Sequence, residues 1–184
     1  MLPERESRII VLHLTKYGDS SLIVHALQKG GGRTGFFLRA RGGKSGTGPF
    51  HSLGIADIVT ARSKGNLPFI RDALPAHHLL SIRTDPYKSA IAIFIGELLY
   101  RCITEEKIDD ELFCFIEDEI CRLESLASPC ANFHLCFMVG LCRVMGFLPK
   151  DNYSARQPYF GIENAEFAAE PAAGSFSGEC SRIL

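Results

Sequence analysis

The hydrophobic pattern of residues 8–77 is that of short strands separated by turns. Stretches rich in β-branched and aromatic residues recur at a spacing of roughly 8–12 residues, which predicts a small barrel or sandwich. The first two stretches are apolar on both faces, so we expect the outside of this β domain to pack on another domain. A bulge or bend is expected at Gly54. The predicted strands lie in RIIVLHLT (8–15), LIVHAL (22–27), FFLRA (36–40), FHSLGIADIVTAR (50–62) and LPFIRDALPAH (67–77).

From residue 84 the apolar period lengthens to three or four residues, which is typical of amphipathic helices. Asp85 followed by Pro86 is a helix start, with an N-cap and then proline at the first helical position. The period predicts a second helix from Asp109 or Asp110, and a third that ends at Gly146. We expect three helices in a bundle, docked on the β domain or on one another.

The periodic signal weakens after residue 152. The stretch YSARQPYFGIENAEF fits either a short hairpin or an extended wrap, and the small, polar residues that follow predict a loose tail. The expected α+β organisation is a β domain at 1–80, an α-helical domain at 81–150 and a short extended or disordered segment at 151–184.

Charge is distributed unevenly, although the formal net charge is only −1. Residues 1–80 hold 11 Lys/Arg and 5 Asp/Glu, a balance of +6, and residues 81–184 hold the other 9 and 16, a balance of −7. A basic half favours an anionic partner, but attraction between the two halves would explain the same asymmetry.

The sequence predicts a cytoplasmic protein. The N-terminus MLPERESRI is charged and lacks the apolar region of a signal peptide. No apolar run approaches the roughly 18 residues that span a membrane. The seven cysteines form no CxxC motif, and most fall in apolar helical patterns, so buried reduced thiols are expected.

The segment RARGGKSGTGPF (39–50) contains the residue types of a phosphate-binding loop. A Walker A loop requires G-x-x-x-x-G-K-[ST] and then, at once, a helix. Gly43, Lys44 and Ser45 match the end of that pattern, but Leu38 stands where its first glycine belongs. Because a Gly- and Pro-containing stretch follows instead of a helix, an ATP or GTP site is not expected.

Basic side chains in this loop and in nearby turns are candidates for contact with a nucleic-acid backbone. Lysine and arginine neutralise phosphates, and aromatic rings stack on bases. The alternative is that these are solvated loop charges and that Phe36 or Phe37 belongs to the core. The DNA-binding candidates are Lys16, Arg39, Arg41, Lys44, Arg62 and Lys64, with Phe36 and Phe37 as stacking candidates.

Catalytic and metal-binding patterns are weak. No Cys or carboxylate follows His77 and His78 at metal-ligand spacing, and Cys114 and Cys121 fit a core-facing helix better than a zinc pair. No Ser/His/Asp order stands out. We therefore predict no catalytic residue, no metal ligand and no enzymatic activity.

Several motifs, in their order and spacing, resemble the RecO family of bacterial recombination mediators. They are YGDSSLIV (17–24), the basic loop after the third predicted strand, and GFLP (146–149), and the resemblance covers roughly residues 8–150. It implies an N-terminal five-stranded OB-fold barrel followed by an α-helical domain. It also implies binding of single- and double-stranded DNA, annealing of complementary strands and help in loading the RecA recombinase, without catalysis or a cofactor.

The resemblance further implies partners and a nucleoid-associated location. The partners are RecR, the RecA pathway and the acidic C-terminal tail of single-strand-binding protein. A tail that ends in acidic residues and Phe needs an apolar pocket beside a cation, for which Arg122 and Arg143 are candidates. The alternative function is therefore a protein-interaction adaptor with weak or absent DNA binding.

The chain departs from the family in two ways. Many relatives carry a four-cysteine zinc module after the Gly-aromatic-x-Pro motif, whereas residues 150–167 contain no cysteine, so zinc is not expected. Relatives also continue with further helices. The Ser/Gly-rich end of this sequence is therefore expected to be truncated or altered.

Overall fold

The computed structural model describes residues 5–39, 48–61, 67–104, 108–127 and 130–176. Two compact units, residues 1–137 and 138–184, make up the chain. The division falls inside a helix rather than between predicted domains, and the domain limits at 80/81 and 150/151 stay predictions.

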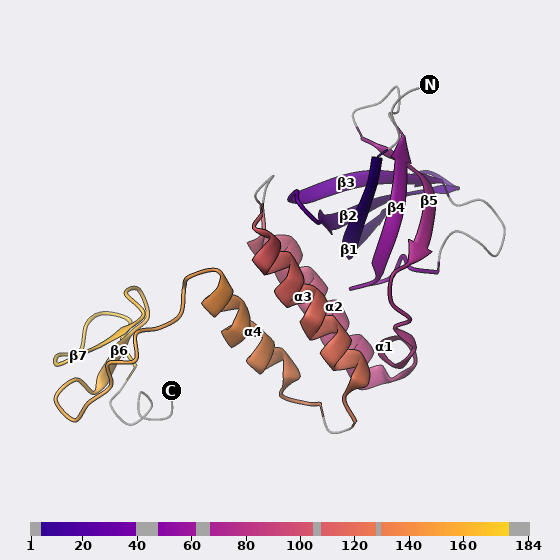
Figure 1. The fold of residues 1–184 in the computed structure, drawn as a ribbon. Coiled ribbons are helices and arrows are strands. Elements are labelled where there is room, and N and C mark those ends of the chain that lie inside the picture. Colours follow the sequence, from indigo (N-terminus) through magenta and orange to yellow (C-terminus); the bar gives the residue numbers. More distant parts are fainter. Residues whose placement is uncertain (1–4, 40–47, 62–66, 105–107, 128–129, 177–184) are drawn as a thin grey trace. The chain divides into compact units, whose positions relative to one another are not determined.

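Five strands form a closed barrel in the order β1-β2-β3-β5-β4 (Figure 1). Neighbouring strands are antiparallel, except that β3 and β5 pair in parallel. This barrel followed by helices confirms the predicted fold class, an OB-fold and then a helical part, and excludes the sandwich. The strands are β1 (Arg5–Lys16), β2 (Ser21–Gln28), β3 (Arg33–Arg39), β4 (Ile55–Ala61) and β5 (Phe69–Pro75).

The bend predicted at Gly54 is a tight turn that precedes β4. The Gly54 N–H donates to the His51 carbonyl, and a Cβ at Gly54 would lie 1.9 Å from the Pro49 oxygen. Only glycine fits at this position. Because the turn ends at Gly54, β4 begins at Ile55 and is shorter than the predicted stretch 50–62. The register shifts that mark bulges lie elsewhere, between Val11 and His13 and between Val59 and Thr60.

The helices are α1 (Leu80–Thr84), α2 (Pro86–Cys102), α3 (Asp110–Ser125) and α4 (Phe133–Val144). The predicted start of α2 is confirmed, because the Asp85 carboxylate accepts from the N–H groups of Tyr87 and Lys88. α3 begins at the predicted place. The five-residue α1 was not predicted.

A buried lysine explains how the short α1 is held. Lys88 of α2 is 3% exposed, and its ammonium donates to Ser81 Oγ and to the Glu124 carbonyl, each at 2.8 Å. The Glu124 carboxylate, from α3, accepts from the N–H groups of Ser81 and Ile82. Because the first N–H groups of a helix have no partner within it, Glu124 acts as a cap supplied from a distant element.

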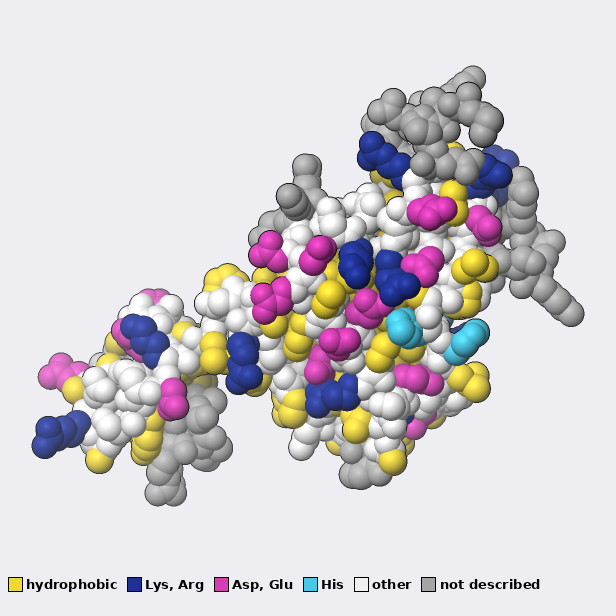
Figure 2. Space-filling view, in the orientation of Figure 1, with side chains coloured by type: hydrophobic (Ala, Val, Ile, Leu, Met, Phe, Trp, Pro, Cys, Tyr) yellow, Lys and Arg dark blue, Asp and Glu magenta, His cyan; other side chains and the backbone are white. Residues whose placement is uncertain are grey.

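Ion pairs join the barrel to α3. Arg8 of β1 donates to both carboxylate oxygens of Asp57 on β4 and to Glu117 on α3, the latter at 3.1 Å. The hydrogen bond from Arg8 holds the pKa of Asp57 below its usual range. Figure 2 shows dark-blue basic and magenta acidic side chains side by side on this face. Helix α3 is thus docked on the barrel, in line with one of the two predicted arrangements.

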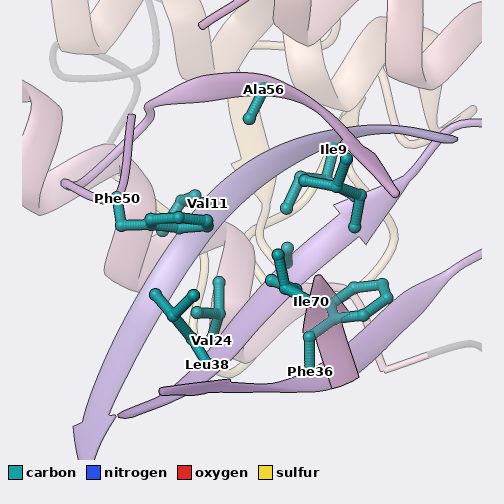
Figure 3. Close-up of a cluster of buried hydrophobic side chains, with 10 residues drawn as sticks. Ile9, Val11, Val24, Phe36, Leu38, Phe50, Ala56 and Ile70 are labelled. Carbon is teal, nitrogen blue, oxygen red and sulfur yellow. The ribbon is translucent and has the colours of Figure 1, made fainter. Parts of the chain in front are cut away.

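Alternate residues of the strands fill the barrel, and Figure 3 shows their side chains converging from different strands. The period of two places every second residue of a strand in the interior. The buried cluster comprises Ile9, Val11, Val24, Ala26, Phe36, Leu38, Phe50, Ala56, Ile58 and Ile70.

The outward face of β1 and β2 is also apolar and buried, and α2 lies against β1. Ile10, Leu12 and Leu27 are at most 3% exposed, in line with the prediction that the barrel packs on another part of the chain. Gly96 of α2 allows this approach. A Cβ there would lie 2.6 Å from Ser52 Oγ and 3.0 Å from the Leu12 carbonyl oxygen.

In the second unit, α4 ends in a Schellman motif. Gly146, with φ of 76°, donates to the Arg143 carbonyl, and the Phe147 N–H donates to that of Cys142. This confirms Gly146 as the residue after the helix cap. The following segment forms a short hairpin, one of the two predicted forms, from β6 (Tyr159–Gly161) and β7 (Glu166–Ala168).

The expected burial of the cysteines is wrong for Cys102, Cys114 and Cys136, which are exposed. On α3 the buried stripe passes beside Cys114 and runs through Leu112, Phe113, Ile116, Ile120 and Leu123. Within the described residues, no helix has the length and apolar character to cross a membrane.

We expect Gly96→Ala to destabilise the protein, although alanine favours a helix by about 1 kcal/mol over glycine. The added methyl group would meet the backbone of β1 and push α2 away from the barrel. Chemical denaturation should show a lower midpoint, and Ala90→Gly on the exposed side of α2 calibrates the propensity change alone. A Gly96→Ala protein more stable than the wild type would contradict the close approach.

Candidate nucleic-acid interface

The register of β1, β2 and β3 places a row of side chains on the outside of the barrel, facing away from the core. Phe36 points into the core, so Phe37 next to it points outward. Thr15, Ile23 and Phe37 are paired directly across the three strands. Tyr17, two residues beyond Thr15, continues the same face.

Three aromatic rings, from the β1–β2 turn, β3 and β5, meet on this face. The rings of Tyr17 and Phe37 pack edge to face with centroids 5.9 Å apart, and those of Phe37 and Phe69 lie 6.1 Å apart at 35°. Tyr17 is 59% exposed, and the other two are half-buried. We call Tyr17, Phe37 and Phe69 the aromatic row. Its rings present partly open π-faces, which suit stacking on bases.

Two of the predicted basic residues lie at the same end of the sheet as the aromatic row. Arg39 follows Phe37 by two residues on β3, and Lys16 ends β1; both are exposed. Ser21 pairs with Arg39 and accepts from the Tyr17 N–H, which brings the two strand ends together. The other predicted cations, Arg41, Lys44, Arg62 and Lys64, lie outside the described residues.

The aromatic row occupies the part of the barrel where OB-folds receive oligonucleotides. In this fold the binding face is formed by strands 2 and 3 together with the loops between strands 1 and 2 and between strands 4 and 5. Here the β1–β2 turn carries Tyr17, and β5, which carries Phe69, begins after the β4–β5 connection. The sequence places Arg62 and Lys64 in that connection.

Phe36 is a correction to the predicted stacking pair. It is 2% exposed and belongs to the barrel core, so its ring is closed to any ligand. The two adjacent phenylalanines must face opposite sides of a strand. The apolar Leu38, on the same side as Phe36, was the signal that could have distinguished them.

Tyr17 and Phe69 were missed as site residues. Tyr17 lies in the β1–β2 turn, and the sequence of a turn does not indicate which strand its tyrosine will contact. Phe69 reaches Phe37 only through the parallel pairing of β3 with β5, which joins segments about thirty residues apart. Nothing local in the sequence indicates that pairing.

The two predicted peptide-binding arginines are placed differently. Arg122 donates to the Glu119 carboxylate and lies over the Phe133 ring at 4.9 Å, so its guanidinium is already engaged. Arg143 is exposed and belongs to the second unit. As partner-binding residues both stay predictions.

Two adjoining apolar hollows, together called the groove, lie by the 48–55 turn. One is bounded by the end of β5 and by α1 and contains Leu80, and the other is bounded by α1 and α2 and contains Ile93; these side chains are 66% and 63% exposed. Arg83 and His51 line both hollows. Burial lowers the pKa of His51 below its ordinary value, so Arg83 carries the positive charge near neutral pH.

A Cys–His–Glu arrangement beside the barrel is not an activated nucleophile. His77 Nδ1 lies 3.7 Å from Cys121 Sγ, and its Nε2 lies 3.2 Å from Glu117. Burial, followed by the nearby Glu117 carboxylate, raises the pKa of the Cys121 thiol. The thiol is therefore protonated near neutral pH and unreactive. In the described part of the chain, no cluster of three His, Cys, Asp or Glu is suited to a metal ion.

Phe36→Ala and Phe37→Ala should differ sharply in stability. Truncating the core ring of Phe36 leaves a cavity and is expected to cost about 3–5 kcal/mol of unfolding free energy. Phe37→Ala, on the outer face, should cost much less. Urea denaturation of both variants measures the difference, and equal losses would contradict the inward and outward assignment.

Comparison with known proteins yields one consistent family. A family model described as "Recombination protein O C terminal" matches residues 83–157. A DNA repair protein RecO from Bacteroides fragilis is 36% identical over 165 residues, which cover 87% of this chain and 68% of that protein. Those from Phocaeicola vulgatus and Flavobacterium johnsoniae are 33% and 29% identical, covering 95% and 88% of this chain and 75% and 70% of theirs.

Proposed function

The chain belongs to the RecO family of DNA repair proteins, and on this premise we propose that it is a DNA-binding recombination mediator. In this role it anneals complementary strands and assists recombinase loading onto single-stranded DNA, acting with RecR in the RecA pathway and without catalysis. The observation that carries the proposal is the aromatic row on the open face of an OB barrel, with the exposed Lys16 and Arg39 at the same end of the sheet.

The geometry of the row suits a single strand better than a duplex. Bases in a duplex are stacked on each other, whereas an unpaired strand can offer base faces to Tyr17, Phe37 and Phe69. Phosphates would then run past the cations at the ends of β1 and β3. Such a surface binds with little sequence preference and with an affinity that falls as salt rises.

Tyr17→Ala/Phe37→Ala should weaken binding of a labelled oligothymidine by about 5- to 150-fold for each base that no longer stacks on a ring. Fluorescence anisotropy measures the affinity, and thermal melting confirms that the variant is folded. Leu74→Ala, which removes an exposed apolar side chain at the other end of β5, is the matched control and should bind like the wild type. If the double variant binds DNA as tightly as the wild type, the aromatic row is not part of the DNA-binding site.

Removal of the cations should instead change how the affinity for DNA depends on salt concentration. Lys16→Ala/Arg39→Ala should reduce the slope of log affinity against log salt by about 0.7 for each phosphate that is no longer neutralised. Arg39→Ala/Arg41→Ala/Lys44→Ala tests the loop in the same way. The measurement is the same titration at two salt concentrations. An unchanged slope and affinity would show that these cations face solvent only.

A second candidate function is that of an adaptor for the acidic C-terminal tail of single-strand-binding protein. It is favoured by the groove beside Arg83, because its exposed apolar walls and positive rim complement a peptide that ends in acidic residues and Phe. Arg122 is already paired with Glu119. Arg83, by contrast, lies beside an apolar hollow and has no carboxylate partner in the described structure.

Arg83→Glu should abolish calorimetric binding of such a peptide, because the acidic residues would face a carboxylate. Arg101→Glu, an equally drastic change at an exposed position near the end of α2, is the control and should bind normally. Equal loss in both variants would reflect net charge alone and would argue against the groove. Peptide binding by a protein that binds no DNA would support the adaptor function by itself.

A further inference from the structure

A second cluster of rings and cations lies on the same outer face of the barrel, beside the end of α2. The His13 ring stacks on Tyr100 with centroids 5.1 Å apart, and the His25 ring meets Tyr100 edge-on at 5.2 Å. The Arg33 guanidinium lies over the Tyr100 ring at 4.8 Å. We call His13, His25, Arg33 and Tyr100 the histidine cluster.

The strand register makes the histidine cluster continuous with the aromatic row. His25 pairs with His13 on one side and Gly35 on the other, and Ile23 pairs in the same way with Thr15 and Phe37. The two cross-strand rows are two residues apart, which is about 6.6 Å along a strand. Arg33, four residues before Phe37 on β3, shares its outward face, so an extended strand of nucleotides can cross both.

The cluster is pre-formed and accessible. Arg33 donates to the Tyr100 carbonyl near the end of α2, where helix carbonyls have no partner within the helix, and so fixes the tyrosine. His13 keeps 44% of its side chain exposed, and His25 is half-buried with Nε2 3.3 Å from Thr15 Oγ1. Neither imidazole is therefore sealed beneath α2.

The charges around the two imidazoles are mixed. Glu97 of α2 lies 3.7 Å from His13 Nδ1 and is also paired with Arg101. Burial, then the neighbouring His13 and Arg33, lowers the pKa of His25. In the free protein His25 is thus neutral near pH 7, and a proton can still be added.

We propose that bound single-stranded DNA continues from the aromatic row onto the histidine cluster, where His13 and His25 bind its phosphates as imidazolium ions. A phosphate near an imidazole favours the protonated form, so binding takes up protons. By linkage, the affinity for DNA rises as the pH falls. This inference rests on the proposed DNA-binding function and adds to it a set of residues and a pH dependence.

The test compares the wild type with His13→Gln/His25→Gln in anisotropy titrations of a labelled oligothymidine at about pH 6 and about pH 8, at constant ionic strength. The wild type should bind about 10-fold more tightly at the lower pH, and one fully linked proton would give about tenfold per pH unit. In the double variant, the ratio of the DNA affinities at the two pH values should fall close to one. His78→Gln, at an exposed position beyond the C-terminal end of β5, should keep the wild-type pH dependence.

The outcomes distinguish a failure of this inference from a failure of the proposed DNA-binding function. If wild-type affinity has no pH dependence, or if the double variant keeps it, the inference fails while DNA binding stands. If the wild type binds no DNA at either pH, the proposed function fails and the inference with it. If the double variant melts early, the single variant His13→Gln, at an exposed position, must lower the pH ratio for the inference to stand.

Discussion

The contact of α2 with β1 is the constraint on which the rest of the barrel surface depends. Gly96 lets the helix approach until a single methyl group would meet the Leu12 carbonyl, and Ile10 and Leu12 on the outer face of β1 are buried. The helix thus closes the part of the barrel that it covers. The histidine cluster forms around Tyr100 in its last turn, and the aromatic row follows two residues further along the strands; both stay partly exposed.

A hollow on another side of the barrel is rich in carboxylates. A hollow over β1, β4 and β5 is lined by Glu6, Asp57 and Asp72, with Arg8 as the one cation among the residues that line it. Arg8 is bound to Asp57 and Glu117, so its charge is already neutralised. Phosphates would be repelled from this side. Although residues 1–80 are basic as a whole, this hollow gathers three of their five acidic residues, which favours the other side of the barrel for a nucleic acid.

Local signals accounted for the elements that depend on local chemistry. Asp85 and Pro86 began α2 because a carboxylate caps free N–H groups, and Gly146 ended α4 because its φ is positive. The short α1 could not be foreseen, since its cap is Glu124, about forty residues away. At the candidate site, Arg39 and Phe37 were candidates from the sequence and stay predictions, whereas Phe36 lies in the core, because adjacent residues of a strand face opposite sides.

By itself, the sequence determined the fold class, the starts of α2 and α3, the end of α4, the basic half and the family, because strand period, capping and motif order are short-range properties. Only the tertiary structure decided which rings meet. Phe69 joins Phe37 through a parallel pairing of distant strands, and His13 and His25 meet Tyr100 because α2 lies across β1. Such contacts depend on how elements close in space, and no residue pattern along one strand or helix encodes the partner it will face.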